Sequence, residues 1–513
     1  MGEKTSRIRN TTINSTLALL SKILIFVLQF ICRTVFIRIL STEYLGINGL
    51  FTNILTMLSF AELGIGSAII YKLYKPIAQN DQEKIKTYLN FYRKAYIFIG
   101  IVILAIGIVI IPALKYIVKD VPDIKENIYY IYILFLVNST ISYFFTYKKS
   151  IIIGYQKEYI TTIINLVSVI IQNIIQIVIL LFTRNYILYL LVQIAFTFLD
   201  NFISSMLANK MYPFIKDKEY RKISKQEEKN IFKDVKSLIL YKLGNTLSTG
   251  TDNIIISAFV GVSEVGLLSN YTTITNAINS FLTSFFNAFT ASVGNLNAGE
   301  DIKKQESVFY QMLFIAFVIC GMVSTVIILL INDFITIWLG EEYVLSGLIA
   351  IILGVNMYID GMRFINYTFR TTMGIFKEGR LVPIISAIVN VVLSIIFVQF
   401  WGIFGVLFAT AIARLFITTF FDPYLLHKLR FKTKCRKFYF RYIYYAIVFG
   451  INLAICYLFL QYINIQGFWG LIVKGILILI ITSIIFLIFV FKTEEYKEVK
   501  KIFVKKLLKK GEK

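Results

Sequence analysis

Charged side chains inside long apolar stretches are the residues of this sequence best suited to do chemistry. A charge near the centre of a bilayer costs about 3 kcal/mol, so those that persist usually face a water-filled cavity or a partner. Arginine donates paired hydrogen bonds to phosphate oxygens and lysine acts as a point charge, so the cations suit an anionic ligand such as a diphosphate. A carboxylate in this setting carries a proton or binds a sodium ion. The candidate ligand-binding cations are Lys22, Arg33, Lys242, Arg363 and Arg414, and the candidate ion-coupling carboxylates are Glu62, Asp252 and Asp360.

Some of these charges also have a structural interpretation as members of ion pairs or caps. Asp360 and Arg363 lie three residues apart on one helical face, where they can neutralise each other. Arg414 can pair with Asp360 or with Asp200 across a helix bundle. Asp252 can cap a helix that is broken beside it. For these residues the binding and structural interpretations both stay open.

The other intramembrane cations differ in how easily they can reach the membrane surface. Arg33 and Lys242 can extend their long side chains toward it, whereas Lys22 lies deep and has no partner within four residues, which favours a cavity. We expect Arg370 to reach the cytoplasmic surface. Lys474 is expected to be a packing or interface residue.

The elements that position these charges must be membrane helices. Of the 513 residues, 57% are hydrophobic and 16% charged, and the mean hydropathy is +0.72. About fourteen apolar stretches are each about twenty residues long, enough to cross a hydrocarbon core. The sequence therefore predicts an all-α polytopic membrane protein. The second span, Tyr44–Tyr71, and the eighth, Ser263–Ala298, are diluted by Gly, Ser, Thr and Asn, so we expect them to face a cavity.

The net charge of +23 does not indicate nucleic-acid binding, because the basic residues gather in alternate loops. The positive-inside rule places these loops, and both termini, in the cytoplasm. The four cysteines are scattered and there is one histidine, so we expect neither a disulfide framework nor a metal site. The loops on the other side are short and no nucleophile or phosphate-loop motif is present, so we expect no catalytic residues, no enzymatic activity and no organic cofactor.

The sequence repeats itself after 220 residues, which predicts two similar bundles related by an axis along the membrane normal. The matching residues, with the first copy before the second in each pair, are Leu45-Gly46-Ile47 and Val265-Gly266-Leu267, Asp81 and Asp301, Lys84 and Lys304, Gly154 and Gly374, Lys157 and Lys377, and Glu158 and Glu378. Predicted domains are a six-helix lobe (1–209), a cytoplasmic linker (210–234), a second six-helix lobe (235–427), and two added helices with a basic tail (428–513). The tail either lies on an anionic leaflet or is solvated.

Several stretches carry a resemblance to a known family. In the first half these are Arg38-Ile-Leu-Ser-Thr-Glu-Tyr-Leu-Gly46 and Leu63-Gly64-Ile-Gly66-Ser-Ala68; in the second, Lys242-Leu-Gly244-Asn245, Asp252-Asn-Ile-Ile-Ile-Ser257 and Gly402-Ile-Phe-Gly405-Val-Leu-Phe-Ala409-Thr410. With this order and spacing the chain resembles the oligosaccharide flippases of the multidrug/oligosaccharidyl-lipid/polysaccharide exporter (MOP) superfamily. That superfamily also contains multidrug extruders and lipid II flippases.

The resemblance implies a flippase in the bacterial inner membrane that works by alternating access between two lobes. Its implied substrate is an undecaprenyl-diphosphate-linked oligosaccharide for O-antigen, capsule or a similar polymer, moved from the cytoplasmic to the outer leaflet. Proton or sodium coupling, contact with membrane lipids, and association with a polymerase and glycosyltransferases are expectations of the same kind. One alternative is an ion-coupled exporter of small cationic drugs, whose cavity should be rich in carboxylates. Another is a non-transporting scaffold for glycan-assembly enzymes, which would tolerate loss of Lys22 and Arg33.

Overall fold

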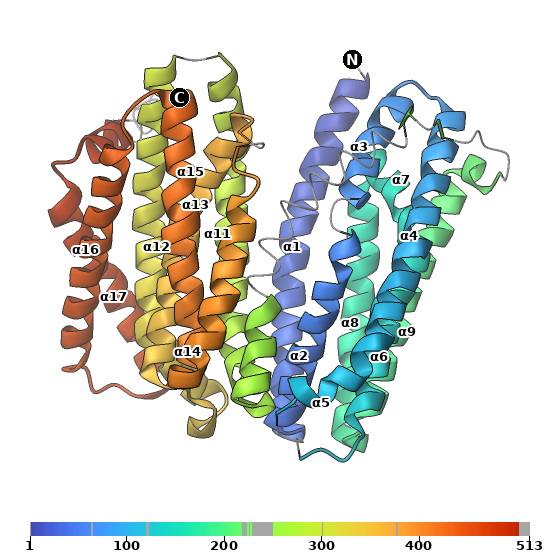
Figure 1. The fold of residues 1–513 in the computed structure, drawn as a ribbon, viewed down its shortest axis with the longest axis horizontal. Helices are drawn as coiled ribbons and strands as arrows, with labels where there is room; N and C mark the ends of the chain where they lie inside the picture. The colour runs from blue at the N-terminus through green and yellow to red at the C-terminus, as the bar shows by residue number, and fades with distance from the viewer. Residues whose placement is uncertain are drawn as a thin grey trace. The chain divides into compact units, whose positions relative to one another are not determined.

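The computed structural model describes residues 2–62, 65–119, 123–217, 223–224, 226–227, 250–299, 301–375 and 378–501, and these form helices joined by short connections (Figure 1). The chain divides into two compact units, Met1–Gly266 and Leu267–Lys513. Ten of the described helical stretches are long and apolar enough to cross a membrane. The predicted all-α, multi-pass membrane fold is confirmed.

The first unit packs its helices around aromatic side chains. Helix α1 packs along α8, α8 packs against α9, and α6 packs against α9. Phe51 lies edge-on to the rings of Tyr132 and Phe135, with ring centroids 5.2 and 5.8 Å away. The helices of this unit are α1 (Gly2–Ile39), α2 (Thr42–Leu58), α3 (Ile65–Ala78), α4 (Gln82–Ile110), α5 (Leu114–Ile117), α6 (Ile128–Ile141), α7 (Lys149–Gly154), α8 (Glu158–Thr183) and α9 (Tyr186–Met211).

Two predicted spans in this unit are broken rather than continuous. The span expected over Tyr44–Tyr71 ends as an α-helix at Leu58 and passes into the 3₁₀ segment η1 (Ser59–Glu62) before α3 begins. The Ser59 hydroxyl donates to the Leu55 carbonyl at 2.9 Å, a back-bond that bends helices. The fourth span likewise passes from α6 through η3 (Ser142–Phe144) and η4 (Thr146–Lys148) to α7. Apolar length predicted both spans but could not show these interruptions.

In the second unit, the stretch labelled α14 (Val382–Ala413) consists of two helices that form a hairpin. Gly402 has φ 54° and ψ −132°, which reverses the chain within α14. Across the turn, Asn390 Nδ2 donates to Thr410 Oγ1 at 2.8 Å. The predicted break between two spans at Gly402 is therefore confirmed. The elements of this unit are most of α11 (Val262–Gly299), then α12 (Ile302–Trp338), α13 (Gly347–Thr372), α14 (Val382–Ala413), the π-helical η7 (Arg414–Thr418), α15 (Thr419–Leu426), the π-helical η8 (His427–Phe431), α16 (Arg436–Leu460) and α17 (Gly467–Val490).

The added helices α16 and α17 pack against each other and against α12, at the edge of the second unit (Figure 1). The described start of the basic tail is tied to this unit, because Arg441 Nη2 lies 2.8 Å from Glu495 Oε2 and Val499 packs against the hydrophobic core. The rest of the tail lies outside the described residues, as does most of the seventh predicted span. Helices lie at all of the remaining predicted spans.

Several of the repeated residues that the structure describes lie at helix ends and at one close helix crossing. Asp81 and Asp301 both cap helices, accepting hydrogen bonds from the Lys84 and Lys303 amides. A Cβ on Gly46 would lie 2.0 Å from the Val262 carbonyl oxygen, and one on Gly266 would lie 2.3 Å from the Thr42 carbonyl oxygen. Each contact thus involves the carbonyl four residues before the other glycine. The two repeated glycines let the starts of α2 and α11 meet backbone to backbone.

Candidate functional site

Three charged side chains meet between α13 and the π-helical segment η7. Arg414 Nη1 donates to Asp360 Oδ2 at 2.6 Å, and Arg363 Nη2 lies 3.9 Å from Asp360 Oδ1. Arg363 Nη1 also donates to the Thr418 hydroxyl at 3.2 Å. One carboxylate is therefore shared by two guanidinium groups, and the trio keeps a formal charge of +1. We call Asp360, Arg363 and Arg414 the charged trio.

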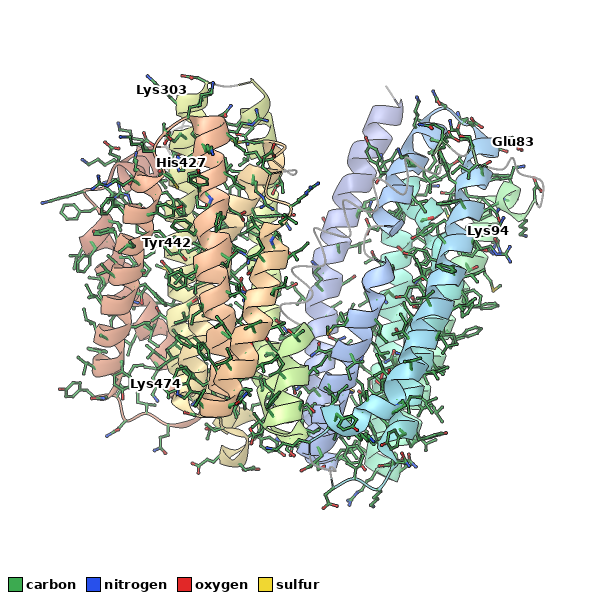
Figure 2. All side chains as sticks on the ribbon, in the orientation of Figure 1. Glu83, Lys94, Lys303, His427, Tyr442 and Lys474 are labelled. Atoms are coloured by element: carbon green, nitrogen blue, oxygen red, sulfur yellow. The ribbon has the colours of Figure 1, made fainter. Side chains whose placement is uncertain are left out.

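The local fold explains why these residues converge. Asp360 and Arg363 lie three residues apart on one face of α13, and Arg414 and Thr418 begin and end the π-helical segment. Such segments place an extra residue in a helical turn and occur often at functional sites. Tyr442 lies next to the trio, and Figure 2 shows it between the ends of the second unit marked by Lys303 and Lys474.

The trio is neither sealed nor fully open. The side chains of Asp360, Arg363 and Arg414 are 28%, 24% and 13% exposed, so each retains some accessible surface. The guanidinium groups can present N–H donors to a phosphate oxygen without first leaving a fully closed site. Of the two partners that the sequence left open for Arg414, the structure selects Asp360. Asp200 instead pairs with Lys149 in the first unit, at 2.5 Å.

A second ion pair lies beside the trio and corrects one expectation. Arg370 does not reach a membrane surface: its side chain is 3% exposed, and Nη1 donates to Asp422 Oδ1 at 2.6 Å. Asp422 follows Arg414 and Thr418 at four-residue intervals, so all three positions lie on the face directed toward α13. That spacing was the signal in the sequence that could have identified Asp422, which was not among the candidates.

Two candidate cations of the first unit, Lys22 and Arg33, lie on one face of α1. Lys22, Gln29 and Arg33 are separated by seven and four residues, which brings them to nearly the same angle around a helix. Lys22 and Gln29 are exposed, whereas Arg33 is half-buried and close to Tyr189 of α9. Lys22 and Arg33 are about 16 Å apart along the helix, at 1.5 Å per residue. Lys242, the counterpart of Lys22 in the repeat, lies outside the described residues.

The remaining candidate carboxylates lie apart from the trio in the chain. Glu62 ends the 3₁₀ segment η1, where the Tyr96 hydroxyl donates to its Oε1 at 2.8 Å. A Cβ on Gly66 would lie 2.9 Å from the Tyr92 hydroxyl, so the small residue leaves room for these tyrosines. Asp252 is half-buried in the helical residues 250–259. The roles of all the candidates stay predictions.

Comparisons with known proteins indicate a family and a fold. The family model described as "Polysaccharide biosynthesis protein" matches residues 11–291. A comparison with curated protein sequences gives no match.

Solved structures share the fold over most of the chain. The lipid II flippase MurJ, in an inward closed conformation, is 18% identical with a TM-score of 0.61, and the match covers 93% of this chain and 99% of that one. An inward-facing multidrug resistance MATE transporter of the MOP superfamily is 16% identical, with a TM-score of 0.60 over 80% of this chain and 94% of that one. A mutant of the Vibrio cholerae MATE transporter VcmN is 12% identical with a TM-score of 0.54, and the match covers 84% of this chain and 99% of that one. The expected MOP fold is confirmed.

Proposed function

Because the chain belongs to the family of polysaccharide biosynthesis proteins, we propose that it is a flippase for a polysaccharide precursor. The proposed substrate is an undecaprenyl-diphosphate-linked oligosaccharide, moved from the cytoplasmic to the outer leaflet of the bacterial inner membrane by alternating access. Its fold, shared with a multidrug transporter and a lipid II flippase, supports transport rather than enzymatic activity. The observation that carries the proposal is the charged trio, in which two guanidinium groups share one carboxylate.

The trio can recognise a diphosphate by exchange of partners. Phosphate oxygens would compete with Asp360 for the N–H groups of Arg414 and with the Thr418 hydroxyl for those of Arg363. Arginine binds phosphate through paired hydrogen bonds. The surplus of one positive charge attracts the anion, while the carboxylate stays close enough to take the guanidinium groups back when the anion leaves. A site of this kind holds the headgroup without trapping it.

Membrane potential favours the proposed direction. With the cell interior negative, outward movement of one unneutralised negative charge is favoured by about 2.3 kcal/mol per 100 mV. The trio therefore needs to neutralise a diphosphate only in part. Partial neutralisation leaves the bound headgroup with a negative charge that the potential drives outward.

Coupling to a proton or sodium ion belongs to the same proposal, with Asp360 as the first coupling candidate and Glu62 and Asp252 as the others. Protonation of Asp360 would change the charge of the trio from +1 to +2 and strengthen its hold on an anion. Loss of that proton would weaken the hold. Cytoplasmic termini, and association with a polymerase and glycosyltransferases, are further parts of the proposal.

The test is a leaflet assay in cells that depend on this protein. Depletion should leave lipid-linked oligosaccharide on the cytoplasmic leaflet, and wild-type protein should restore its transfer. The double variant Arg363→Gln with Arg414→Gln should fail to restore it at equal membrane abundance. Lys474→Gln is the matched control, because it removes an intramembrane cation whose partner is Asp333, away from the trio. Transfer at the normal rate after depletion would exclude the flippase.

The same assay separates the two alternatives. A scaffold for glycan-assembly enzymes would support polymer synthesis with both arginines replaced, and also with Lys22 and Arg33 replaced together. An exporter of small cationic drugs should gain rather than lose transport when Arg363 and Arg414 are neutralised, because Asp360 would then be an unpaired carboxylate in the site. Drug efflux measured in the double variant distinguishes this outcome.

A further inference from the structure

A basic pocket in the first unit lies apart from the candidate residues described above. Its volume is about 480 Å³, and it opens among the first turns of α4, the 3₁₀ segment η4, the end of α9 and the 3₁₀ segment η5 (Pro213–Lys216). All of its walls belong to the first unit. Its charged and amide lining consists of one carboxylate, Asp217, with Lys86, Asn90, Arg93, Lys148, Asn209 and Lys216.

In the described part of the chain, most of the cations in this pocket have no carboxylate within salt-bridge distance. Lys86 is the exception, because its Nζ lies 2.6 Å from Glu83 and 3.6 Å from Asp217. Lys148 lies close enough to Arg93 and Lys216 for their charges to act on it. Among the described residues, no carboxylate lies within salt-bridge distance of Arg93, Lys148 or Lys216. Three like charges therefore converge on one pocket, which destabilises the empty site and favours an anion.

The remaining lining suits an anion with several oxygen acceptors. The Lys148 ammonium lies 5.8 Å from the centre of the Tyr147 ring, a contact that orients it. Asn90 and Asn209 add amide groups, and the Asn209 side-chain oxygen is buried without a hydrogen-bond partner in the described part of the chain. Rotation of that amide presents N–H donors instead. The volume lies within the range of about 300–1,000 Å³ that is common for ligand sites.

The position of the pocket indicates where the anion comes from. Arg93 lies two residues before the apolar run of α4, which begins at Ala95, and Lys148 lies immediately after the apolar part of the fourth span. Side chains at such boundaries lie at the level of lipid headgroups. Figure 2 shows Glu83 near the end of the first unit and Lys94 further along α4. Arg93 precedes Lys94 in that helix. The basic loops assign this end to the cytoplasmic leaflet.

We propose that this pocket binds a phosphate-bearing anion at the cytoplasmic membrane surface. Arg93, Lys148 and Lys216 hold the phosphate oxygens, and Asn90 and Asn209 donate to those that remain. The phosphate belongs either to the headgroup of an anionic lipid or to a free phosphate ion. The proposal does not depend on what the protein transports.

Binding is tested on the purified full-length protein in detergent by thermal unfolding. The probes are dioctanoyl phosphatidylglycerol, dioctanoyl phosphatidylcholine with the same chains, and inorganic phosphate. Phosphatidylglycerol or phosphate should raise the unfolding temperature saturably, and phosphatidylcholine should not. Saturation by phosphatidylglycerol alone identifies a lipid headgroup, and saturation by phosphate at similar concentration identifies the free ion. Equal stabilisation by phosphatidylcholine overturns the proposal without the need for any variant.

Variants then locate the site. The triple variant R93Q/K148Q/K216Q should weaken binding at least about 100-fold, since each charge-assisted contact contributes roughly tenfold. It should unfold, without ligand, no earlier than the wild type, because like-charge repulsion is removed. The conservative variant R93K/K148R/K216R should keep binding. The matched control K94Q/K157Q/K210Q removes the same charge from the same unit outside the pocket and should bind as the wild type does. Unchanged binding in the first variant overturns the proposal.

Discussion

The crossing of α2 and α11 provides the sharpest test of how this fold is held together. Replacing Gly46 with alanine adds a Cβ 2.0 Å from the Val262 carbonyl oxygen. Carbon and oxygen atoms in contact lie about 3.3 Å or more apart. The two backbones must therefore separate by about 1.3 Å at this point. The nearest obstacle is a main-chain oxygen, so rotation of the Val262 side chain, whose Cγ1 would lie 2.8 Å away, cannot by itself make room.

The expected cost follows from two opposing effects. Overpacking of this kind costs typically about 1–3 kcal/mol, and a backbone obstacle places it at the upper end. Alanine gains up to about 1 kcal/mol over glycine inside a helix. The net loss is about 2 kcal/mol, which lowers the unfolding temperature by about 4–8 °C for a unit of this size. Gly266→Ala should act in the same way, because its Cβ would lie 2.3 Å from the Thr42 carbonyl oxygen.

Gly49→Ala is the matched control on the same helix. Its Cβ would lie 3.5 Å from Val265 Cγ1, an ordinary contact, so the variant should keep or raise the wild-type unfolding temperature. Thermal unfolding of the three purified variants, followed by intrinsic fluorescence in one detergent, measures the difference. If Gly46→Ala unfolds at the same temperature as Gly49→Ala, the starts of α2 and α11 do not meet as described.

Three further substitutions test the ion pairs and one carboxyl group. Arg370→Gln leaves Asp422 buried and unpaired, so purified protein should lose about 3–5 kcal/mol in a denaturation experiment; a loss below that of Lys474→Gln would contradict the buried pair. Lys474→Gln should cost at most about 1 kcal/mol, because its carboxylate partner is 41% exposed. Burial tends to raise the pKa of Glu43, but hydrogen bonds from Ser263 and neighbouring hydroxyls lower it below 4.5 overall. Its carboxylate therefore stabilises the fold above that pH, so Glu43→Gln should be less stable at pH 7 and the difference should vanish as the pH falls below 4.5; a constant difference would refute the assignment.

The candidate site was partly predictable because some of its residues are close in sequence. Asp360 and Arg363 share a helical face by spacing alone, and their partnership was one of the interpretations that the sequence allowed. Arg414 had two candidate partners, Asp200 and Asp360, in different parts of the chain. Spacing cannot choose between them, because the choice depends on how α13 and η7 are rotated about their axes when they pack.

Two sequence-based expectations were wrong, the surface position of Arg370 and the continuity of the second span, because both depend on packing between segments. Arg370 was expected at a membrane surface because hydropathy measures distance along a helix, not the direction of a side chain around it. In the structure, Asp422 faces it from α15, and a paired charge can stay buried at that depth. The break after Leu58 was missed because apolar composition continues through it, while the Ser59 back-bond that accompanies it is a property of the folded helix.

Hydropathy and turn residues such as Gly402 determined the membrane helices and their approximate limits, since these features depend on neighbours along the chain. The 220-residue repeat predicts that the two halves are related. Packing settled which charges neutralise each other, which glycines allow backbone contact, and where three separate segments leave Arg93, Lys148 and Lys216 around one pocket. Those outcomes depend on helix rotation and approach, to which residues from distant segments contribute together. The periodicity of a single helix shows which of its residues share a face, but not which other segment that face meets.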